Sequence, residues 1–192
     1  MINTLYEPFR HWSDGGSVWI ISDTHFADPD CRIMDPKWPS EGEMVKAINK
    51  SVKKNDTLIH LGDVGNPEYI SQIKAHHKVL ILGNHDARGR YTAVFDEIYT
   101  GPLMISPKIL LSHEPIPLPF VFNIHGHDHS KCICFPEGCE HMNLAANVCG
   151  YKPVSLGDII KEGYLANTPT IHRLAIDEQV SHSSKERYYG GR

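Results

Sequence analysis

The first half of the chain alternates between short aliphatic runs and amphipathic segments. Runs of this length that stop at glycine or polar residues are typical of strands buried on both faces. They lie at residues 18–21, 57–61 and 78–82. The predicted helices follow them, at residues 40–54, 66–76 and, more weakly, 90–95. Strand, helix, strand, helix and strand in this order indicate a parallel sheet with right-handed crossovers.

Two of these helices also have recognisable start signals. Ser40 and Glu43 stand three residues apart and predict a capping box, and Asn66-Pro67 predicts the start of the second helix. Met44 and Ile48 belong to the apolar stripe of the first helix. These signals support the alternating pattern independently of the strands.

The second half of the chain changes to strands joined by turns. The predicted strands lie at residues 103–106, 109–112 and 120–124, the first two forming a hairpin around Pro107. Residues 132–135 and 141–148 could pair with each other, and a last helix is predicted at residues 155–165. We expect one domain over residues 1–176 and a flexible polar tail over residues 177–192.

Five predicted strands end in side chains that can bind a metal or move a proton. These residues are Asp23, His25, Asp63, Asn84, His85, His113, His127 and His129. Since the carboxyl ends of parallel strands meet at one edge of a sheet, we expect the side chains to gather there. Apart from His85, they make seven oxygen or imidazole donors and no thiolate. That set is too large for one ion and suits two divalent cations that share a bridging carboxylate.

Composition and charge narrow the class of protein. The 192 residues suffice for one sizeable domain, and 41% hydrophobic with 22% charged residues is typical of a soluble globule. A net charge of -4 argues against binding nucleic acid by charge alone. The five cysteines are an odd number, no secretory signal precedes them, and no apolar run approaches a membrane span. We therefore expect a cytoplasmic protein with reduced thiols and no membrane contact.

The polar strand ends, taken in order, carry a resemblance to a known family. The motifs are Asp23-Thr24-His25, Gly62-Asp63, Gly83-Asn84-His85-Asp86, His113 and Gly126-His127-Asp128-His129. Over residues 18–165 they resemble the calcineurin-like metallophosphoesterases, and among these the small, capless, single-domain members. The resemblance implies an α/β fold in which two β-sheets are sandwiched and flanked by helices. It also implies a dimetal site at the C-terminal ends of the strands.

The resemblance implies a role for each matching residue. One metal would be held by Asp23, His25 and His129, a second by Asn84, His113 and His127, and Asp63 would bridge the two. His85 would protonate the leaving oxygen or steady the phosphoryl group, with Asp86 orienting it. Mn²⁺ is the favoured metal, and Fe, Ni, Co and Zn suit the same donors.

The implied reaction is hydrolysis of a small phosphate ester, with phosphodiesters favoured, by a hydroxide that bridges the two metals. Gly62-Asp63 continues as Val64-Gly65 and lacks the Asp-Arg-Gly of the protein phosphatases, which disfavours protein substrates. The alternatives are a nuclease or cyclic-nucleotide phosphodiesterase, then a phosphomonoesterase. Outside enzymes, a scaffold like the retromer subunit of this fold is the alternative. The oligomeric state stays open.

Several other residues admit two interpretations. Arg88 either donates to a substrate phosphate or is a solvated loop residue. His60 and His125 are expected to be packed or to support ligands, and Asp128 to point away from the metals. Cys132, Cys134, Cys139 and His141 offer the donors of a zinc site, but ordinary strand alternation favours plain reduced cysteines.

Two loops are expected to determine specificity, since no cap domain is present to do so. They span residues 26–39 and 114–119. The first, with Trp38, either forms the rim of a pocket or is a surface loop anchored by one aromatic ring.

Overall fold

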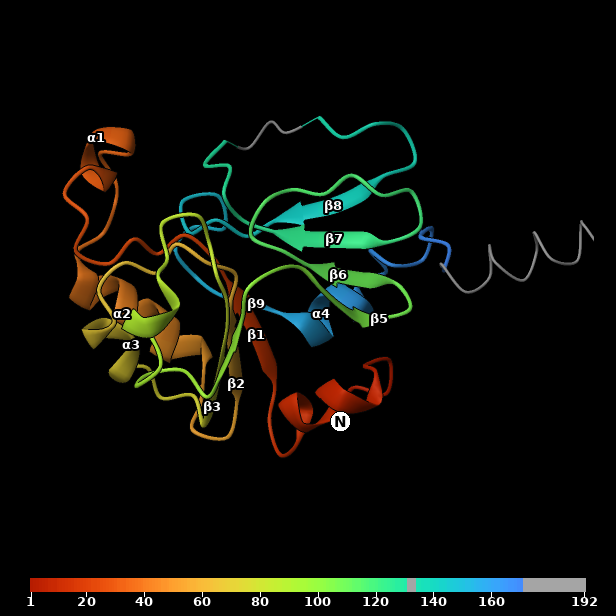
Figure 1. The fold of residues 1–192 in the computed structure, drawn as a ribbon, viewed down its shortest axis with the longest axis horizontal. Helices are drawn as coiled ribbons and strands as arrows, with labels where there is room; N and C mark the ends of the chain where they lie inside the picture. The colour runs from red at the N-terminus through yellow and green to blue at the C-terminus, as the bar shows by residue number, and fades with distance from the viewer. Residues whose placement is uncertain (131–133, 171–192) are drawn as a thin grey trace, which may run out of the picture.

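Two β-sheets enclose a shared hydrophobic core, and α2 and α3 cover the other face of the first sheet (Figure 1). The structure is a computed structural model that describes residues 1–130 and 134–170. The first sheet has the order β4-β3-β2-β1-β9 and is parallel except for β9. The second has the order β5-β6-β7-β8 and is parallel except for β5. The expected α/β architecture of two sandwiched sheets with flanking helices is confirmed.

The elements follow the predicted order closely in the first half of the chain. The strands are β1 Val18–Ile21, β2 Thr57–His60, β3 His77–Ile81, β4 Glu97–Tyr99, β5 Leu103–Ser106, β6 Ile109–Leu111, β7 Phe122–His125, β8 Glu140–Asn143 and β9 Val154–Ser155. The α-helices are α1 Cys31–Met34, α2 Glu41–Ser51, α3 Glu68–Ser71 and α4 Leu156–Lys161, and the 3₁₀ helices are η1 Glu7–Ser13 and η2 Arg88–Arg90.

The aliphatic runs form buried strands because both faces of the first sheet are covered. Successive side chains of a strand point to opposite faces. Ile59 therefore packs in the core between the sheets, whereas its neighbour Leu58 packs against α2 and α3. Val79 and Leu80 of β3 divide in the same way. This double burial explains why the strands read as continuous apolar runs without alternation.

The predicted helix at residues 66–76 is too long. The Asn66 side chain accepts a hydrogen bond from the backbone N–H of Glu68, as expected at a helix start, but α3 ends at Ser71. Beyond it, Asn49 of α2 donates to the carbonyl of Gln72 and accepts from the N–H of Lys74. The helix stops because a neighbouring side chain takes these backbone groups.

The predicted helix at residues 90–95 is also wrong. A single 3₁₀ turn, η2, occupies Arg88–Arg90, and turns without regular helix follow it. Tyr91 fixes this segment, since its ring is buried and its hydroxyl donates to the carbonyl of Gly65. Tertiary anchoring overrides the local helical pattern here.

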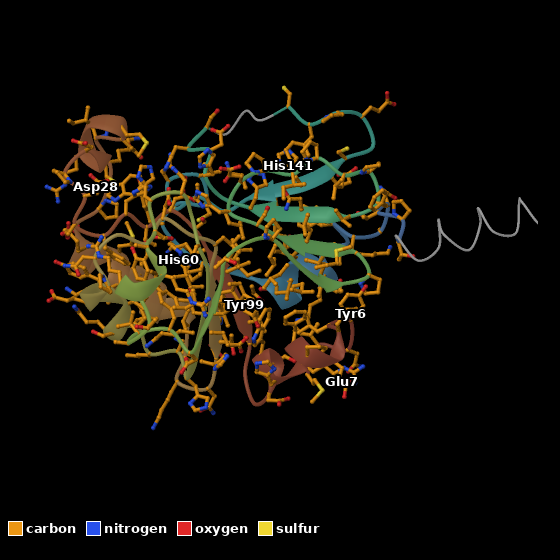
Figure 2. The ribbon with its side chains drawn as sticks, viewed as in Figure 1. Tyr6, Glu7, Asp28, His60, Tyr99 and His141 are labelled. Carbon is orange, nitrogen blue, oxygen red and sulfur yellow. The ribbon has the colours of Figure 1, made fainter. Side chains whose placement is uncertain are left out.

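Within the described residues, the pairing expected between residues 132–135 and 141–148 is not found. β8 pairs in parallel with β7, and residues 134–139 form no strand. Phe135 packs its ring on His141 of β8, with the centroids 3.8 Å apart (His141 is labelled in Figure 2). The predicted tail at residues 177–192 and Cys132 lie outside the described residues. Within those residues, each helix is too short or too polar to cross a bilayer.

Candidate metal centre

The ends of five strands converge on one region, but they come from two sheets. β1, β2 and β3 belong to the first sheet, whereas β6 and β7 belong to the second. The expectation that all would lie at one edge of a single sheet is therefore wrong. The hairpin of β5 and β6 starts the second sheet, and hydrogen bonds from Ser22 to Leu144 and from Asp23 to Gly62 draw the strand ends together.

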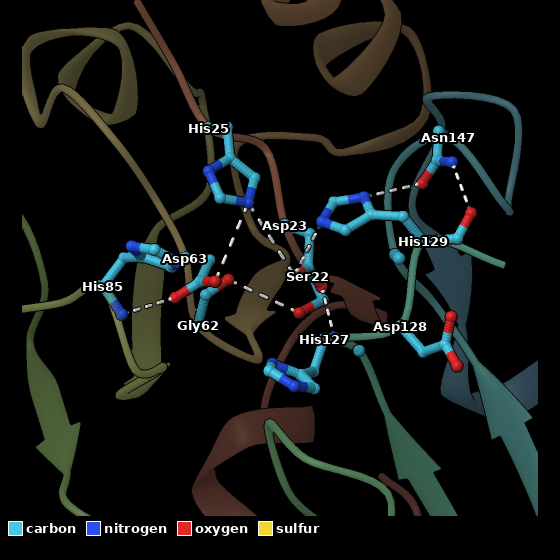
Figure 3. A network of polar contacts seen from close by, with 12 residues as sticks. Ser22, Asp23, His25, Gly62, Asp63, His85, His127, Asp128, His129 and Asn147 are labelled. Carbon is cyan, nitrogen blue, oxygen red and sulfur yellow. Dashed lines mark hydrogen bonds and ion pairs between the residues drawn. The ribbon is translucent and has the colours of Figure 1, made fainter. Parts of the chain in front are cut away.

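A first group of donors consists of Asp23, His25 and His129. Their ligand atoms all lie within 4.8 Å of one another. Asp23 Oδ1 is 4.0 Å from His25 Nε2 and 3.7 Å from His129 Nε2. Figure 3 shows the two rings on either side of the carboxylate. Asp23 Oδ2 accepts a hydrogen bond from the backbone N–H of His127, which fixes the direction of Oδ1.

A second group consists of Asp63, His113 and His127, and Asn84 joins it. The ligand atoms of the first three also lie within 4.8 Å of one another. Asn84 Oδ1 is 2.9 Å from His113 Nε2 and 3.1 Å from His127 Nδ1. One amide oxygen and two imidazoles thus face a common point beside the Asp63 carboxylate.

Asp63 stands between the two groups. Its Oδ2 lies 3.7 Å from His25 Nε2 in the first group and 3.5 Å from His113 Nε2 in the second. Its Oδ1 accepts a hydrogen bond from the backbone N–H of His85 at 3.0 Å. Asp63 is therefore the carboxylate that faces both groups.

Three of the histidines have their second ring nitrogen engaged away from the centre. His113 Nδ1 lies 2.9 Å from the carbonyl of Leu61, and His129 Nδ1 lies 3.1 Å from Asn147 Oδ1. His25 Nδ1 lies 3.5 Å from Asp28 Oδ2. An N–H donated on this side leaves the lone pair of Nε2 directed at the centre, which is the arrangement of metal-binding histidines.

Asn147 and Asp28 were not identified from the sequence. Asn147 lies in a segment that was predicted to be a strand, and it also donates to the carbonyl of His129. Asp28 lies in a loop rich in acidic residues. Neither stands in a motif, so only the folded chain reveals that each orients a histidine.

The backbone is strained where the donors are attached. Asp23, His25, Asp63 and His127 all have positive φ, between 42° and 66°. Non-glycine residues seldom adopt this region, and clusters of them mark functional sites that the rest of the fold holds in place. The strain is concentrated on donor residues. A purely structural role for these residues would not require it.

Burial leaves two polar atoms of the centre without partners. Asp23 Oδ1 and His25 Nε2 are buried and accept or donate no hydrogen bond among the described residues. Burial also raises the pKa of Asp23 and lowers the pKa of His25, because it disfavours the charged form of each. A divalent cation at this point would supply the missing partner to both atoms. The donors present therefore fit a divalent-metal site.

The comparison with known protein families agrees with this chemistry. A model of the calcineurin-like phosphoesterases matches residues 16–138. The chain belongs to that family. It is thus related to hydrolases that act on phosphate esters with divalent metals.

The chain is also similar to the following proteins. An uncharacterised protein of Methanocaldococcus jannaschii is 29% identical over 75% of this chain and 89% of its own. The crystal structure of a protein of unknown function from Aquifex aeolicus has 29% identity and a TM-score of 0.62, over 76% of this chain and 98% of that one. The nuclease MPE of Pseudomonas putida matches at 22% identity and a TM-score of 0.45, over 58% of this chain and 61% of its own.

His85 of this phosphoesterase is exposed beside the first donor group. Its ring centroid lies 5.8 Å from that of His25, and the two histidines line the same two cavities. Asp86, which was expected to orient His85, contacts other groups. Its carboxylate accepts hydrogen bonds from the backbone N–H groups of Asp63, Val64 and Gly83. It holds the turns that carry the donors.

Two cavities open onto the centre. One of 280 Å³ lies over the donors themselves, and one of 520 Å³ lies beside it, between the loop at residues 26–39 and η2. Phe26 and Met34 contribute to these walls, so the loop is a pocket rim. Trp38 is nearly buried behind it, with its ring near those of His25 and His129.

The arginine that faces the larger cavity is Arg90. Arg88, the residue singled out in the sequence, is exposed and does not line either cavity. The loop at residues 114–119 contributes Glu114 and Ile116 to a third cavity of 280 Å³ on the other side of Asn84. Both loops expected to determine specificity therefore flank the centre.

His60 and His125 are packed, as expected. His60 is fully buried between Thr24 and the backbone of Gly62, and burial lowers its pKa to about 3. His125 is fully buried beside His141, and burial lowers its pKa to about 4. Both are thus neutral at physiological pH.

Among the described residues, Asp128 and the thiols other than Cys31 lie outside the groups of possible metal ligands. Cys134 and Cys139 are free, and neither belongs to a group of possible metal ligands within the described residues. Cys31, His25 and Asp28 form a further group whose ligand atoms lie within 4.8 Å of one another, and burial raises the pKa of the Cys31 thiol to about 12. The Asp128 carboxylate accepts from the N–H of Ser130 and points away from the donors (Figure 3).

Proposed function

We propose that this chain hydrolyses phosphate esters, with phosphodiesters favoured, at a centre of two divalent metal ions. Asp23, His25 and His129 would hold one ion, and Asn84, His113 and His127 the other. Asp63 would bridge them. Carboxylate, amide and imidazole donors suit Mn²⁺ as the favoured ion, and Fe, Ni, Co or Zn as alternatives.

The position of Asp63 carries this proposal. One of its oxygens lies within 3.7 Å of an imidazole from each donor group, so a single carboxylate serves both. A pair of divalent ions, when bound, activates water and neutralises the charge of a phosphoryl group. A decayed, non-catalytic relative would have lost some of these donors, whereas all seven are in place here.

The side chains around the centre divide the remaining tasks. His85 would give a proton to the leaving oxygen, since its exposed ring reaches into the cavities that flank the first group. Arg90, at the wall of the larger cavity, would donate to a phosphate oxygen. It replaces Arg88 in this role.

The charge of the cavity walls favours a diester over a monoester. Among the residues described as lining the two cavities, Arg90 is the one permanently charged cation, whereas Asp28 and Asp30 are acidic. A monoester carries up to two negative charges at neutral pH and a diester only one. The acidic walls therefore repel the diester less, and the larger cavity offers room for its second ester group.

The test compares an aryl phosphate diester with the matching monoester, using protein loaded with Mn²⁺. We expect faster hydrolysis of the diester. We also expect His85→Ala to lower the rate by about 10² to 10⁴-fold, the usual contribution of a general acid, with the metal content unchanged.

His76→Gln is a matched control, since His76 is exposed and belongs to neither donor group. Full activity of the His85→Ala protein at unchanged metal content would exclude the acid role. Failure of the metal-loaded protein to hydrolyse either ester would favour the alternative that the protein is a non-catalytic scaffold.

A further inference from the structure

A second cluster of metal-binding side chains lies at the opposite end of the first sheet. His11 of η1, His77 at the start of β3 and Glu97 at the start of β4 bring their ligand atoms within 4.8 Å of one another. Strands β3 and β4 are parallel, and the candidate metal centre lies beyond their carboxyl ends. With a rise of about 3.3 Å per residue, β3 separates the two places by roughly 13 Å or more.

The side chains of His11, His77 and Trp12 all point at one oxygen of Glu97. Glu97 Oε1 lies 2.6 Å from His11 Nε2 and 2.6 Å from His77 Nε2. The two imidazole rings face each other at 5.4 Å between centroids, nearly at right angles. Trp12 Nε1 donates to the same oxygen at 2.9 Å. A carboxylate oxygen has two lone pairs, so three N–H donors exceed what it can accept.

His77 can present either a proton or a lone pair to Glu97. With its proton on Nε2, the neutral ring donates to Glu97 Oε1 at 2.6 Å. With the proton on Nδ1, which lies 3.7 Å from Asp96 Oδ2, Nε2 turns a lone pair to the same point. A divalent cation held between this nitrogen and the carboxylate would bind both. A carboxylate behind a histidine whose other nitrogen faces a metal is also the usual support of metal-binding histidines.

The Glu97 carboxylate is held in place without the histidines. Trp12 of η1 donates to Oε1, and Tyr99 of β4 donates to Oε2. Figure 2 labels Tyr99, and it labels Glu7 at the start of η1. Burial opposes ionisation, but the hydrogen bonds from Tyr99, His11, Trp12 and His77 lower the pKa of Glu97 to about 2. The carboxylate is thus charged and preoriented.

We propose that His11, His77 and Glu97 form a second metal-binding site, suited to Zn²⁺, that fastens the N-terminal segment to the edge of the first sheet. Two imidazoles and one carboxylate are an established zinc donor set, completed by water. The His11 side chain is 47% exposed, which leaves the fourth position open to solvent. Zinc distances of about 2.0–2.2 Å require the donors to spread slightly, and the exposed His11 ring permits it.

The metal would hold the N-terminal segment in place and would have no part in hydrolysis. Trp12 is buried in the core between the sheets. His11 precedes it in η1 and lies against the start of β3 and β4. A metal that joins this segment to β3 and β4 binds the folded chain and not the unfolded one, so it raises the thermal midpoint.

The test counts zinc in the full-length protein after incubation with Zn²⁺ and removal of unbound metal. We expect His77→Gln and His11→Gln each to hold one zinc equivalent fewer than the unaltered protein. The exposed neighbour variant His76→Gln should keep the full number. All proteins share the same candidate metal centre, so the difference reports the cluster alone.

A second measurement separates a metal site from a set of hydrogen bonds. Zn²⁺ should raise the thermal midpoint of the unaltered protein more than that of His11→Gln, while hydrolysis with Mn²⁺ stays the same in both. Equal zinc content in the unaltered protein and both histidine variants would overturn the proposal. The cluster would then be a set of hydrogen bonds to Glu97 and not a metal site. If His77→Gln fails to fold, His11→Gln on the exposed segment decides alone.

Discussion

The Asp86 carboxylate ties together the two turns that carry Asp63 and Asn84. It accepts backbone N–H groups from both turns, and no side-chain contact to the His85 ring is needed for this. Burial opposes its ionisation, yet the N–H of Gly83, with His60 and Val64, holds the pKa of Asp86 below its usual value. The residue after His85 thus holds the two donor turns together.

Replacing Asp86 with alanine should therefore damage stability as well as activity. Three backbone N–H groups lose their acceptor, and an unsatisfied buried donor costs about 1–3 kcal/mol. We expect urea unfolding to show a loss of at least that size and Mn²⁺ binding to weaken. Asp14→Ala, at an exposed position, is the control. A variant with unchanged stability and lost activity would restore the direct role in orienting His85.

The donor residues could be read from the sequence because each follows a recognisable strand in a short motif. The residues that orient them could not. Asn147 and Asp28 act through single contacts between segments far apart in the chain, and such contacts leave no local pattern. Arg90 in place of Arg88 is a similar case, since the 3₁₀ turn at η2 decides which arginine faces the cavity.

At the scale of elements, Gly83 lets β3 approach β2 at the centre. A Cβ added at Gly83 would lie 2.2 Å from Asp63 Oδ1 and 2.6 Å from Asp63 N. Backbone cannot move aside as a flexible side chain can. The glycine is therefore required by the contact between two donor turns.

Gly83→Ala should destabilise the protein by about 1–3 kcal/mol, the usual cost of overpacking, and displace Asp63. We expect a lower midpoint in urea and a loss of bound Mn²⁺. Gly89→Ala is the matched control on the same segment, since a Cβ there meets no atom within 4 Å. Equal stability of the two variants would show that the turns are not in tight contact.

The capping box of α2 gives a pH-dependent prediction. Glu43 accepts hydrogen bonds from the side chain and the backbone N–H of Ser40, and these lower the pKa of Glu43. Because the folded-state pKa lies below the ordinary value of 4.5, the stabilisation is complete above pH 4.5 and is lost as the pH falls through the folded-state value.

Glu43→Gln should consequently remove part of the acid sensitivity of folding. The free energy of unfolding of the two proteins should differ by a small, constant amount near neutral pH. The difference should change as the pH falls below 4.5. Urea titrations at several pH values between 3 and 7 measure it. A difference independent of pH would mean that the Glu43 carboxylate does not bind Ser40 in solution.

Local sequence signals predicted a helix or strand well where residues within the element determine its bounds. They predicted it poorly where a residue from a neighbouring element determines them. The capping box and stripe of α2 are local, and α2 forms as expected. Asn49 shortens α3, and the anchor at Tyr91 prevents a helix after η2. The strands β4 and β9 were missed because each is short and gains its hydrogen bonds from a distant partner.

At the scale of the molecule, two sheets meet to place donors from five strands around one carboxylate. The sequence alone indicated which strands end in donors, and the family resemblance supplied the second sheet. The strand pattern could not distinguish one sheet from two, because pairing between β6, β7 and β8 joins segments separated by loops. The convergence of the sheets is a property of packing and not of any one segment.

In the proposed function, Asp63 joins two metal ions in one hydrolytic centre. The most direct measurement counts Mn²⁺ per chain and the rate of aryl phosphate diester hydrolysis in the same samples. Both proteins compared carry His11→Gln, so that the cluster around Glu97 does not contribute, and one also carries Asp63→Asn.

We predict two manganese equivalents and hydrolysis in the protein with Asp63. We predict the loss of at least one equivalent, and a rate lower by more than about 100-fold, in Asp63→Asn, since even supporting residues of metal sites cost 10 to 100-fold. Two manganese equivalents and an undiminished rate in the Asp63→Asn protein would show that Asp63 does not bridge two metal ions in a hydrolytic centre.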